Sequence, residues 1–174
     1  MVRKLAARGF DVVLIGNSAD KLQKVAALAV DRKTRVIEFD FGKNSSLDDY
    51  RELYDKFKEL DVSILVNNVQ HADFGTMQGI GTESIETMIT VNCYSLALLT
   101  KLVLETFKRR WTVNAKRSLL INHCAAASIA PMPYLQTYVA TKAFAGHFSY
   151  GLADELKAYV DVVAVRPFGL TESN

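Results

Sequence analysis

The sequence has little cysteine and no surplus of either charge. Its two cysteines, Cys93 and Cys124, are too few for a disulfide framework, so a reducing compartment is expected. The formal net charge of +2 is too balanced to indicate a nucleic-acid-binding protein. No apolar run reaches the about 18 residues of a membrane span, because Lys101 breaks the longest candidate, around 96–104. These features favour a soluble intracellular protein that binds no nucleic acid.

Short β-branched runs alternate with longer segments of helical period. The five runs are predicted strands, at 11–16, 35–39, 62–66, 119–121 and 160–165. Each is apolar at consecutive positions, which is typical of a strand covered on both faces. The predicted helices lie between them, at 18–30, 45–60, 81–109 and 137–159. Repeated strand and helix without hairpin turns predict one doubly wound, Rossmann-like α/β domain over 1–174, with a parallel sheet.

The sequence also lacks a glycine-rich turn. No Gly-x-Gly-x-x-Gly or similar cluster occurs, although such a turn cradles the pyrophosphate in dinucleotide-binding folds. Residues 2–8 are typical of the end of a helix, closed by Gly9. A helix that opens a chain and leads into a strand implies an earlier strand. We therefore expect a chain truncated at both ends, with the first strand and its glycine-rich turn missing.

One pair of residues carries recognisable chemistry. Tyr138 and Lys142 are four positions apart near the start of a predicted helix, so both lie on one helix face. A lysine ammonium beside a phenol is expected to lower the phenol's pKa from about 10, which makes it a general acid or base. The alternative is a surface lysine above a half-buried tyrosine.

Three stretches carry a family resemblance, namely 9–15 (GFDVVLI), 65–69 (LVNNV) and 138–142 (YVATK). In this order and spacing they resemble the short-chain dehydrogenase/reductase family. The nearer resemblance is to its branch of hydroxysteroid (17-beta) dehydrogenases and very-long-chain 3-oxoacyl-CoA reductases. The resemblance implies a nicotinamide-dependent exchange of hydride between a ketone and a secondary alcohol on a lipid or steroid-like substrate.

The resemblance also assigns roles to single residues. Tyr138 would donate the proton, and Lys142 would bind the nicotinamide ribose. Asn92 matches a helix asparagine that holds a water in the proton relay, although it could be a plain polar residue. Asn67 would stabilise the sheet and flank the cofactor, or else cap a turn. Asp40 matches an acidic residue that meets the adenine ring, with a simple turn aspartate as the alternative.

Cofactor choice follows from the end of the first predicted strand. Residues 16–18 are Gly-Asn-Ser. This segment therefore has neither a carboxylate that would bind the ribose hydroxyls of NAD nor an arginine that would bind the 2′-phosphate of NADP. Because no acid would repel the phosphate and Lys21 follows within a turn, NADP is preferred and NAD stays possible. The stretch 167–171, which begins with Pro167, resembles a loop that covers the nicotinamide.

Two departures from the family pattern stand at the site. Ala125 occupies the position of the catalytic serine, 13 residues before the tyrosine, and a methyl group donates no hydrogen bond. Losing one such donor costs on the order of 100- to 1000-fold in rate. Cys124 and Ser128 are possible but weak substitutes. Gln70 replaces a glycine, so that a side chain intrudes where the backbone should approach the nicotinamide.

These observations leave two readings. The first is an NADP-dependent reductase of a lipid carbonyl, and the second is an inactive or fragmentary relative that acts as a binding or scaffold protein. Helices 81–109 and 137–159 could pair in a homodimer, as in the family. The histidines are scattered, so no metal site is expected. Attachment to the endoplasmic reticulum, as in the branch, would need a segment upstream of the cofactor loop.

Overall fold

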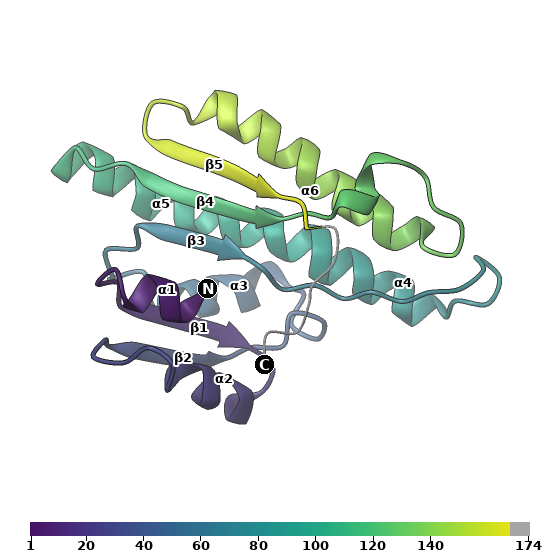
Figure 1. The fold of residues 1–174 in the computed structure, drawn as a ribbon, viewed down its shortest axis with the longest axis horizontal. Coiled ribbons are helices and arrows are strands. Elements are labelled where there is room, and N and C mark those ends of the chain that lie inside the picture. Colours follow the sequence, from purple (N-terminus) through teal and green to yellow (C-terminus); the bar gives the residue numbers. More distant parts are fainter. Residues whose placement is uncertain (168–174) are drawn as a thin grey trace. The chain divides into compact units, whose positions relative to one another are not determined.

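The chain folds into two compact units, Met1–Ser46 and Leu47–Asn174, in a computed structural model that describes residues 1–167. All strand pairs in both units are parallel, which confirms the predicted α/β class with parallel strands (Figure 1). The strands form two sheets, one of two strands and one of three. The single domain over 1–174 stays a prediction.

The first unit contains a two-stranded sheet and two helices: α1 (Val2–Ala6), β1 (Val12–Gly16), α2 (Ala19–Ala26) and β2 (Thr34–Glu38). Val12 of β1 lies opposite Thr34 of β2. Gly9 follows α1 with a φ of +91°, a backbone conformation that glycine adopts without steric cost. The predicted helix end before the first strand is therefore confirmed.

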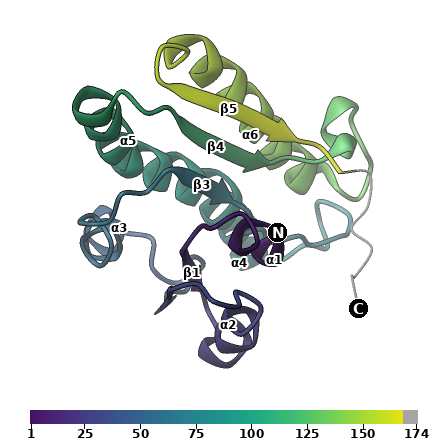
Figure 2. The same ribbon diagram turned by 60° about the vertical axis from the view of Figure 1, so that its left-hand side comes forward.

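The second unit contains a three-stranded sheet of order β3-β4-β5. Its elements are α3 (Leu47–Asp55), β3 (Ile64–Asn67), α4 (Thr82–Ile89), the π-helical turn η1 (Thr90–Tyr94), α5 (Ser95–Asn114), β4 (Ser118–His123), the 3-10 turn η2 (Ala126–Ile129), α6 (Gln136–Glu155) and β5 (Val160–Val165). The loops after β3 and β4 and the beginning of α6 all lie at the carboxyl end of this sheet (Figures 1 and 2).

Hydrogen bonds show that α5 and α6 cover the same face of this sheet. At the end of β3, the Asn67 amide donates to Thr100 Oγ1 of α5 and to Asn122 Oδ1 of β4, both at 2.9 Å. Asn122 in turn donates to Ser149 Oγ of α6 at 2.9 Å. The chain of polar contacts thus ties two strands to two helices, and it fixes the sheet end where the candidate site lies.

The prediction that every strand is covered on both faces is wrong for β5. Val160 is 1% exposed, whereas Val163 and Val165 are 43% and 37% exposed. Successive strand residues point to opposite faces, and within described residues 47–167 the α5 and α6 layer covers one face of this strand. An apolar run was therefore an incomplete guide, because valine is used on the uncovered face as well.

The segments α4, η1 and α5 form one continuous helix, Thr82–Asn114, in place of the predicted 81–109. By length and composition alone, it is the one described helix long and apolar enough to cross a membrane. Lys101 does not interrupt it, because its side chain points out to solvent. Val103 and Phe107 are fully buried, which is typical of a core helix, so the length alone is weak evidence for a membrane span.

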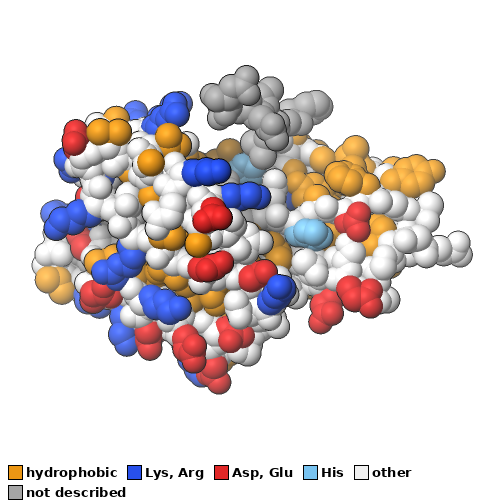
Figure 3. All heavy atoms as spheres, turned by 90° about the horizontal axis from the view of Figure 1, so that it is seen from below, with side chains coloured by type: hydrophobic (Ala, Val, Ile, Leu, Met, Phe, Trp, Pro, Cys, Tyr) orange, Lys and Arg blue, Asp and Glu red, His pale blue; other side chains and the backbone are white. Residues whose placement is uncertain are grey.

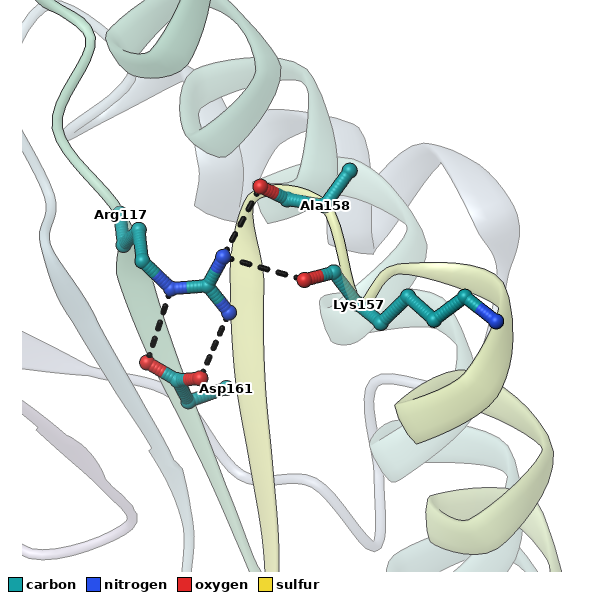
Figure 4. Close-up of polar contacts among 4 residues, drawn as sticks. All are labelled: Arg117, Lys157, Ala158 and Asp161. Atoms are coloured by element: carbon teal, nitrogen blue, oxygen red, sulfur yellow. Dashed lines mark hydrogen bonds and ion pairs between the residues drawn. The ribbon is translucent and has the colours of Figure 1, made fainter.

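At the other end of the three-stranded sheet, where β4 and β5 begin, a cluster of polar contacts forms around Arg117 (Figure 4). Its guanidinium pairs with Asp161 of β5, with an Nη2–Oδ1 distance of 2.6 Å. It also donates to the backbone carbonyls of Lys157 and Ala158, at 3.0 and 2.9 Å. One side chain that precedes β4 therefore holds both the turn after α6 and the beginning of β5.

Candidate active site

Helix α6 brings Tyr138 and Lys142 together. Because α6 begins at Gln136, Tyr138 lies in its first turn and Lys142 one turn later. The Lys142 ammonium lies 5.7 Å from the centre of the Tyr138 ring. Lys142 is 2% exposed, and its Nζ donates to the backbone carbonyl of His123, at the end of β4, at 3.0 Å. The predicted shared helix face is what the structure shows.

The expected lowering of the Tyr138 pKa is wrong for this arrangement. Burial raises the pKa of the phenol, and burial also lowers the pKa of the Lys142 ammonium. Desolvation is the cause of the raised phenol pKa, and the ammonium donates its hydrogen bond to the His123 carbonyl instead of to the phenol. The phenol is thus held in its protonated form, which is the form a general acid requires.

Asn92 lies in the π-helical turn η1 and is 3% exposed. Its Oδ1 accepts from the backbone N–H of His71 at 2.9 Å, and its Nδ2 donates to the His71 carbonyl at 2.8 Å and to Thr141 Oγ1 at 2.9 Å. The side-chain amide therefore ties the loop after β3 to α6 and is already used by the protein. The π turn, a feature often found at functional sites, had no signal in the sequence.

Ala125 stands where the family has its catalytic serine, and neither Cys124 nor Ser128 is available as a hydrogen-bond donor in its place. Ala125 is 8% exposed and precedes the η2 turn. Ser128 Oγ donates its one proton to the Ala125 carbonyl at 2.6 Å. Cys124 is 1% exposed and packs against Leu96 and Ala145, and burial raises the pKa of its thiol. Ser128 is bonded locally, and Cys124 belongs to the core.

Gln70 contacts the candidate proton donor directly. The Tyr138 hydroxyl donates to Gln70 Oε1 at 3.4 Å, across 68 positions of sequence. Gln70 belongs to the loop after β3, and its side chain is exposed. The sequence flagged this position because a glycine was expected there, but it gave no sign of which residue the side chain would reach.

Two of the predicted cofactor ligands have structural partners. The Asn67 amide donates both of its hydrogen bonds within the protein, to Thr100 and Asn122, which supports its predicted role in the sheet. The carbonyl of Pro167, the last described residue, accepts from the backbone N–H of Ala126 at 3.2 Å and so joins the end of β5 to the loop after β4. The rest of the predicted nicotinamide loop, 168–171, lies outside the described residues.

Asp40 belongs to the first unit, Met1–Ser46. Its Oδ1 accepts from the backbone N–H of Gly42 at 2.9 Å, and its Oδ2 lies 4.0 Å from Lys43 Nζ. The carboxylate thus stabilises its own turn, as the alternative reading held, and contact with adenine stays a prediction. Ser18 Oγ caps α2 by accepting from the backbone N–H of Lys21 at 3.5 Å.

Comparison with known proteins places these features in a family. The short chain dehydrogenase family model matches residues 1–174. The very-long-chain 3-oxoacyl-CoA reductase of Coccidioides immitis is 32% identical over 162 residues, which are 90% of this chain and 45% of that protein. The protein of the same name from Rattus norvegicus is 34% identical over 177 residues, 95% and 53% of the two chains. The chain spans about half the length of these relatives.

Solved structures agree with the fold. A short-chain dehydrogenase from Sphingobium yanoikuyae in complex with NADPH matches with a TM-score of 0.82 and 26% identity, over 97% of this chain and 65% of that one. A ketone-specific alcohol dehydrogenase from Comamonas testosteroni matches with a TM-score of 0.84 and 23% identity, over 95% and 66% of the two chains, and shows the fold alone. By its family match, its fold and the placement of Tyr138 beside Lys142, the chain belongs to the short-chain dehydrogenase family.

Proposed function

We propose that this chain is part of an oxidoreductase that reduces the ketone of a long-chain 3-oxoacyl-CoA to a secondary alcohol with NADPH. The observation that carries the proposal is the pair of Tyr138 and Lys142 at the carboxyl end of a parallel sheet, where dinucleotide folds bind their ligands. The substrate class follows the names of the relatives that are 32–34% identical to the chain.

Lys142 fits the role of a nicotinamide-ribose ligand. An ammonium has three N–H donors, and in the described part of the chain one of them is used, by the His123 carbonyl. Burial disfavours this charge, as its lowered pKa indicates, so further hydrogen bonds donated to ribose hydroxyl oxygens would stabilise it. Bound NADPH would supply the hydride. Asp40, Asn67 and Pro167 are the other proposed contacts of the cofactor.

Tyr138 acts as the acid in this proposal. As the carbonyl carbon is reduced, negative charge grows on its oxygen, and the phenol gives up its proton to that oxygen. Because burial raises the pKa of Tyr138, the phenol is protonated at neutral pH and ready for reduction. Both donors of the Asn92 amide are engaged, so a water in the relay that recharges Tyr138 would donate to the second lone pair of Asn92 Oδ1 or bind a backbone group of η1.

Exposed apolar side chains near the site fit a lipid substrate. The loops after β3 and β4 are joined by the backbone N–H of Gly75 and the carbonyl of Tyr134, at 2.9 Å. Phe74, Met77 and Ile129 on these loops are 66%, 60% and 73% exposed. Figure 3 shows apolar side chains gathered at the side of the molecule that carries these loops. An acyl chain would cover such a surface.

NADP is the proposed cofactor, with NAD as the alternative. Ser18 is engaged in capping α2, and no carboxylate at 16–18 would repel a 2′-phosphate. The NADPH complex of the Sphingobium yanoikuyae protein is consistent with this choice. A dissociation constant for NADPH well below that for NADH is the expected result.

We also propose that the protein forms a homodimer and that it is attached to the endoplasmic reticulum. Ile89 of α4 and Phe144 of α6 are 49% and 42% exposed on helices whose family counterparts pair between subunits. Attachment to a membrane would follow the branch that the chain resembles.

The test uses the longest natural chain that contains these 174 residues, called the natural chain below. NADPH consumption is followed with a 3-oxoacyl-CoA, and Tyr138→Phe is expected to lower kcat on the order of 100-fold or more while NADPH still binds. Tyr150→Phe is the matched control, because Tyr150 lies on the same helix and is 54% exposed. Turnover that is indifferent to Tyr138→Phe would contradict the proposal.

A binding or scaffold protein is the second candidate, favoured by Ala125 at the position of the catalytic serine. Under this alternative the natural chain binds an acyl-CoA without consuming NADPH, and Tyr138→Phe leaves binding unchanged. The same assay therefore separates the two candidates.

A further inference from the structure

The site lacks a hydrogen-bond donor where the family has its serine, yet a second polar group lies beside Tyr138. Ser128 and Cys124 do not replace the serine, since the first donates to the Ala125 carbonyl and the second is packed in the core. The Gln70 amide, in contrast, lies 3.4 Å from the Tyr138 hydroxyl. It is exposed, so a bound molecule could reach it.

We propose that Gln70 donates to the substrate carbonyl the hydrogen bond that Ala125 cannot give, and that it is a catalytic residue of the reduction. This inference rests on the proposed function. The side chain contacts the group that must itself contact the reacting oxygen, because Tyr138 has to lie within hydrogen-bond reach of the oxygen it protonates. A donor adjacent to Tyr138 therefore faces the same position.

The chemistry of an amide suits both states of the site. A glutamine amide carries an accepting oxygen and an NH₂ with two donors. Without a ligand, Gln70 Oε1 accepts from the Tyr138 hydroxyl. When a carbonyl oxygen takes up the Tyr138 hydrogen bond, rotation of the exposed amide turns its NH₂ toward that oxygen. Neither leucine nor glycine at this position could do so.

The backbone next to Gln70 is held in place. His71, the following residue, has both backbone polar groups bonded to the buried Asn92 amide, at 2.9 and 2.8 Å. Asn92 is bonded in turn to Thr141 of α6, the helix that carries Tyr138. The backbone beside Gln70 and the helix that carries the acid are thus connected through one buried side chain, so that only the side chain of Gln70 has to turn when a carbonyl binds.

The proton balance of the step is simple. The carbonyl carbon gains the hydride that bound NADPH would supply, and the electron pair of the C=O π bond moves to oxygen. That oxygen takes the Tyr138 proton, which leaves a phenolate that is reprotonated from water. Gln70 keeps its own protons and stabilises the charge that develops before the proton arrives.

Gln70→Leu in the natural chain tests the inference. We expect kcat to fall on the order of 100-fold, with the KM for NADPH unchanged, because the lost interaction forms only as charge develops. Gln78→Leu is the matched control, since Gln78 is an exposed glutamine in the same loop. NADPH binding by the Gln70→Leu protein confirms that it is folded.

Two further variants distinguish a donor from a merely structural residue. Ala125→Ser should raise kcat far more in the Gln70→Leu chain than in the wild-type chain, because it restores the only missing donor there. Gln70→Glu should be slow at neutral pH and faster toward pH 4–5, since a carboxyl donates a hydrogen bond only when protonated, with an ordinary pKa of about 4.3.

The outcomes separate this inference from the proposed function. Turnover that depends on Tyr138 but is unchanged by Gln70→Leu overturns the role of Gln70 alone, as does a Gln70→Leu chain that Ala125→Ser fails to rescue. A wild-type natural chain without turnover overturns both.

Discussion

At Tyr138, two influences on the phenol oppose each other. A lysine ammonium 5.7 Å from the ring centre favours the phenolate, whereas burial favours the phenol, and burial prevails, so that the pKa is raised. An acid with a raised pKa stays active until the pH exceeds that pKa. We therefore expect kcat for ketone reduction to be flat through neutral pH and to fall only above about pH 10. A pH profile of the natural chain with a fall centred near pH 7 would be the contrary result.

We expect Lys142 to contribute to cofactor binding rather than to stability. Its buried ammonium has a lowered pKa and one described hydrogen bond, and an apolar side chain of similar length avoids the desolvation. Lys142→Met is expected to leave the midpoint of thermal unfolding unchanged or higher without cofactor, and to weaken NADPH binding about tenfold or more. Differential scanning calorimetry measures the unfolding midpoint and titration calorimetry measures NADPH affinity. Lys101→Met, on the exposed side of α5, is the control. Unchanged affinity would remove Lys142 from the proposed site.

At the scale of single elements, α6 shows what a sequence can and cannot predict. The predicted helix 137–159 corresponds to α6, which ends earlier, at Glu155, and the meeting of Tyr138 with Lys142 follows from helical period alone. The contact of Gln70 with Tyr138 depends instead on the path of a loop 68 positions away. No local pattern specifies such a path, because it is set by the hydrogen bonds of Asn92 in a π-helical turn.

Two glycines of α6 give a matched test of the same helix. A Cβ at Gly151 would meet no atom within 4 Å, whereas a Cβ at Gly146 would lie 2.9 Å from Arg166 Nη2. Gly151→Ala is expected to raise the free energy of unfolding by about 1 kcal/mol, because alanine favours the helix interior. Gly146→Ala should gain less or destabilise the protein, since the guanidinium must move. Urea denaturation of both variants checks the difference, and equal gains would mean that Arg166 does not restrict position 146.

At the scale of the whole molecule, alternation of strands and helices was enough to predict the parallel α/β class. It was not enough to predict the burial of β5. The side chains of Val163 and Val165 are exposed, whereas the equally apolar Val160 of the same strand is buried. Burial is decided by which helices cover a strand, and an apolar run carries no information about them.

Stability in acid depends in part on the cluster around Arg117. Hydrogen bonding to Arg117 holds the pKa of Asp161 below its ordinary value. A carboxyl with a lowered folded-state pKa stabilises the protein above its unfolded pKa, and this contribution is lost as the pH falls through the lowered value. Arg117→Met should therefore lower the melting temperature at pH 7, by an amount that shrinks toward the lowered pKa of Asp161.

Thermal unfolding from pH 7 to pH 3 measures this effect. Arg51→Met is the control, because Arg51 forms an exposed ion pair with Asp48 within α3, which contributes little. A loss of stability in Arg117→Met that is the same at every pH would mean that only the backbone carbonyls of 157–158 matter.

Transfer of label from the cofactor tests the central proposal most directly. The natural chain is mixed with a 3-oxoacyl-CoA and NADPH that carries two deuterium atoms at nicotinamide C4, and the product is analysed by mass spectrometry. We expect one deuterium on the new carbinol carbon of each wild-type product molecule, and on the order of 100-fold less labelled product from Tyr138→Phe in the same time. An unlabelled product, or label transfer that does not depend on Tyr138, would contradict it.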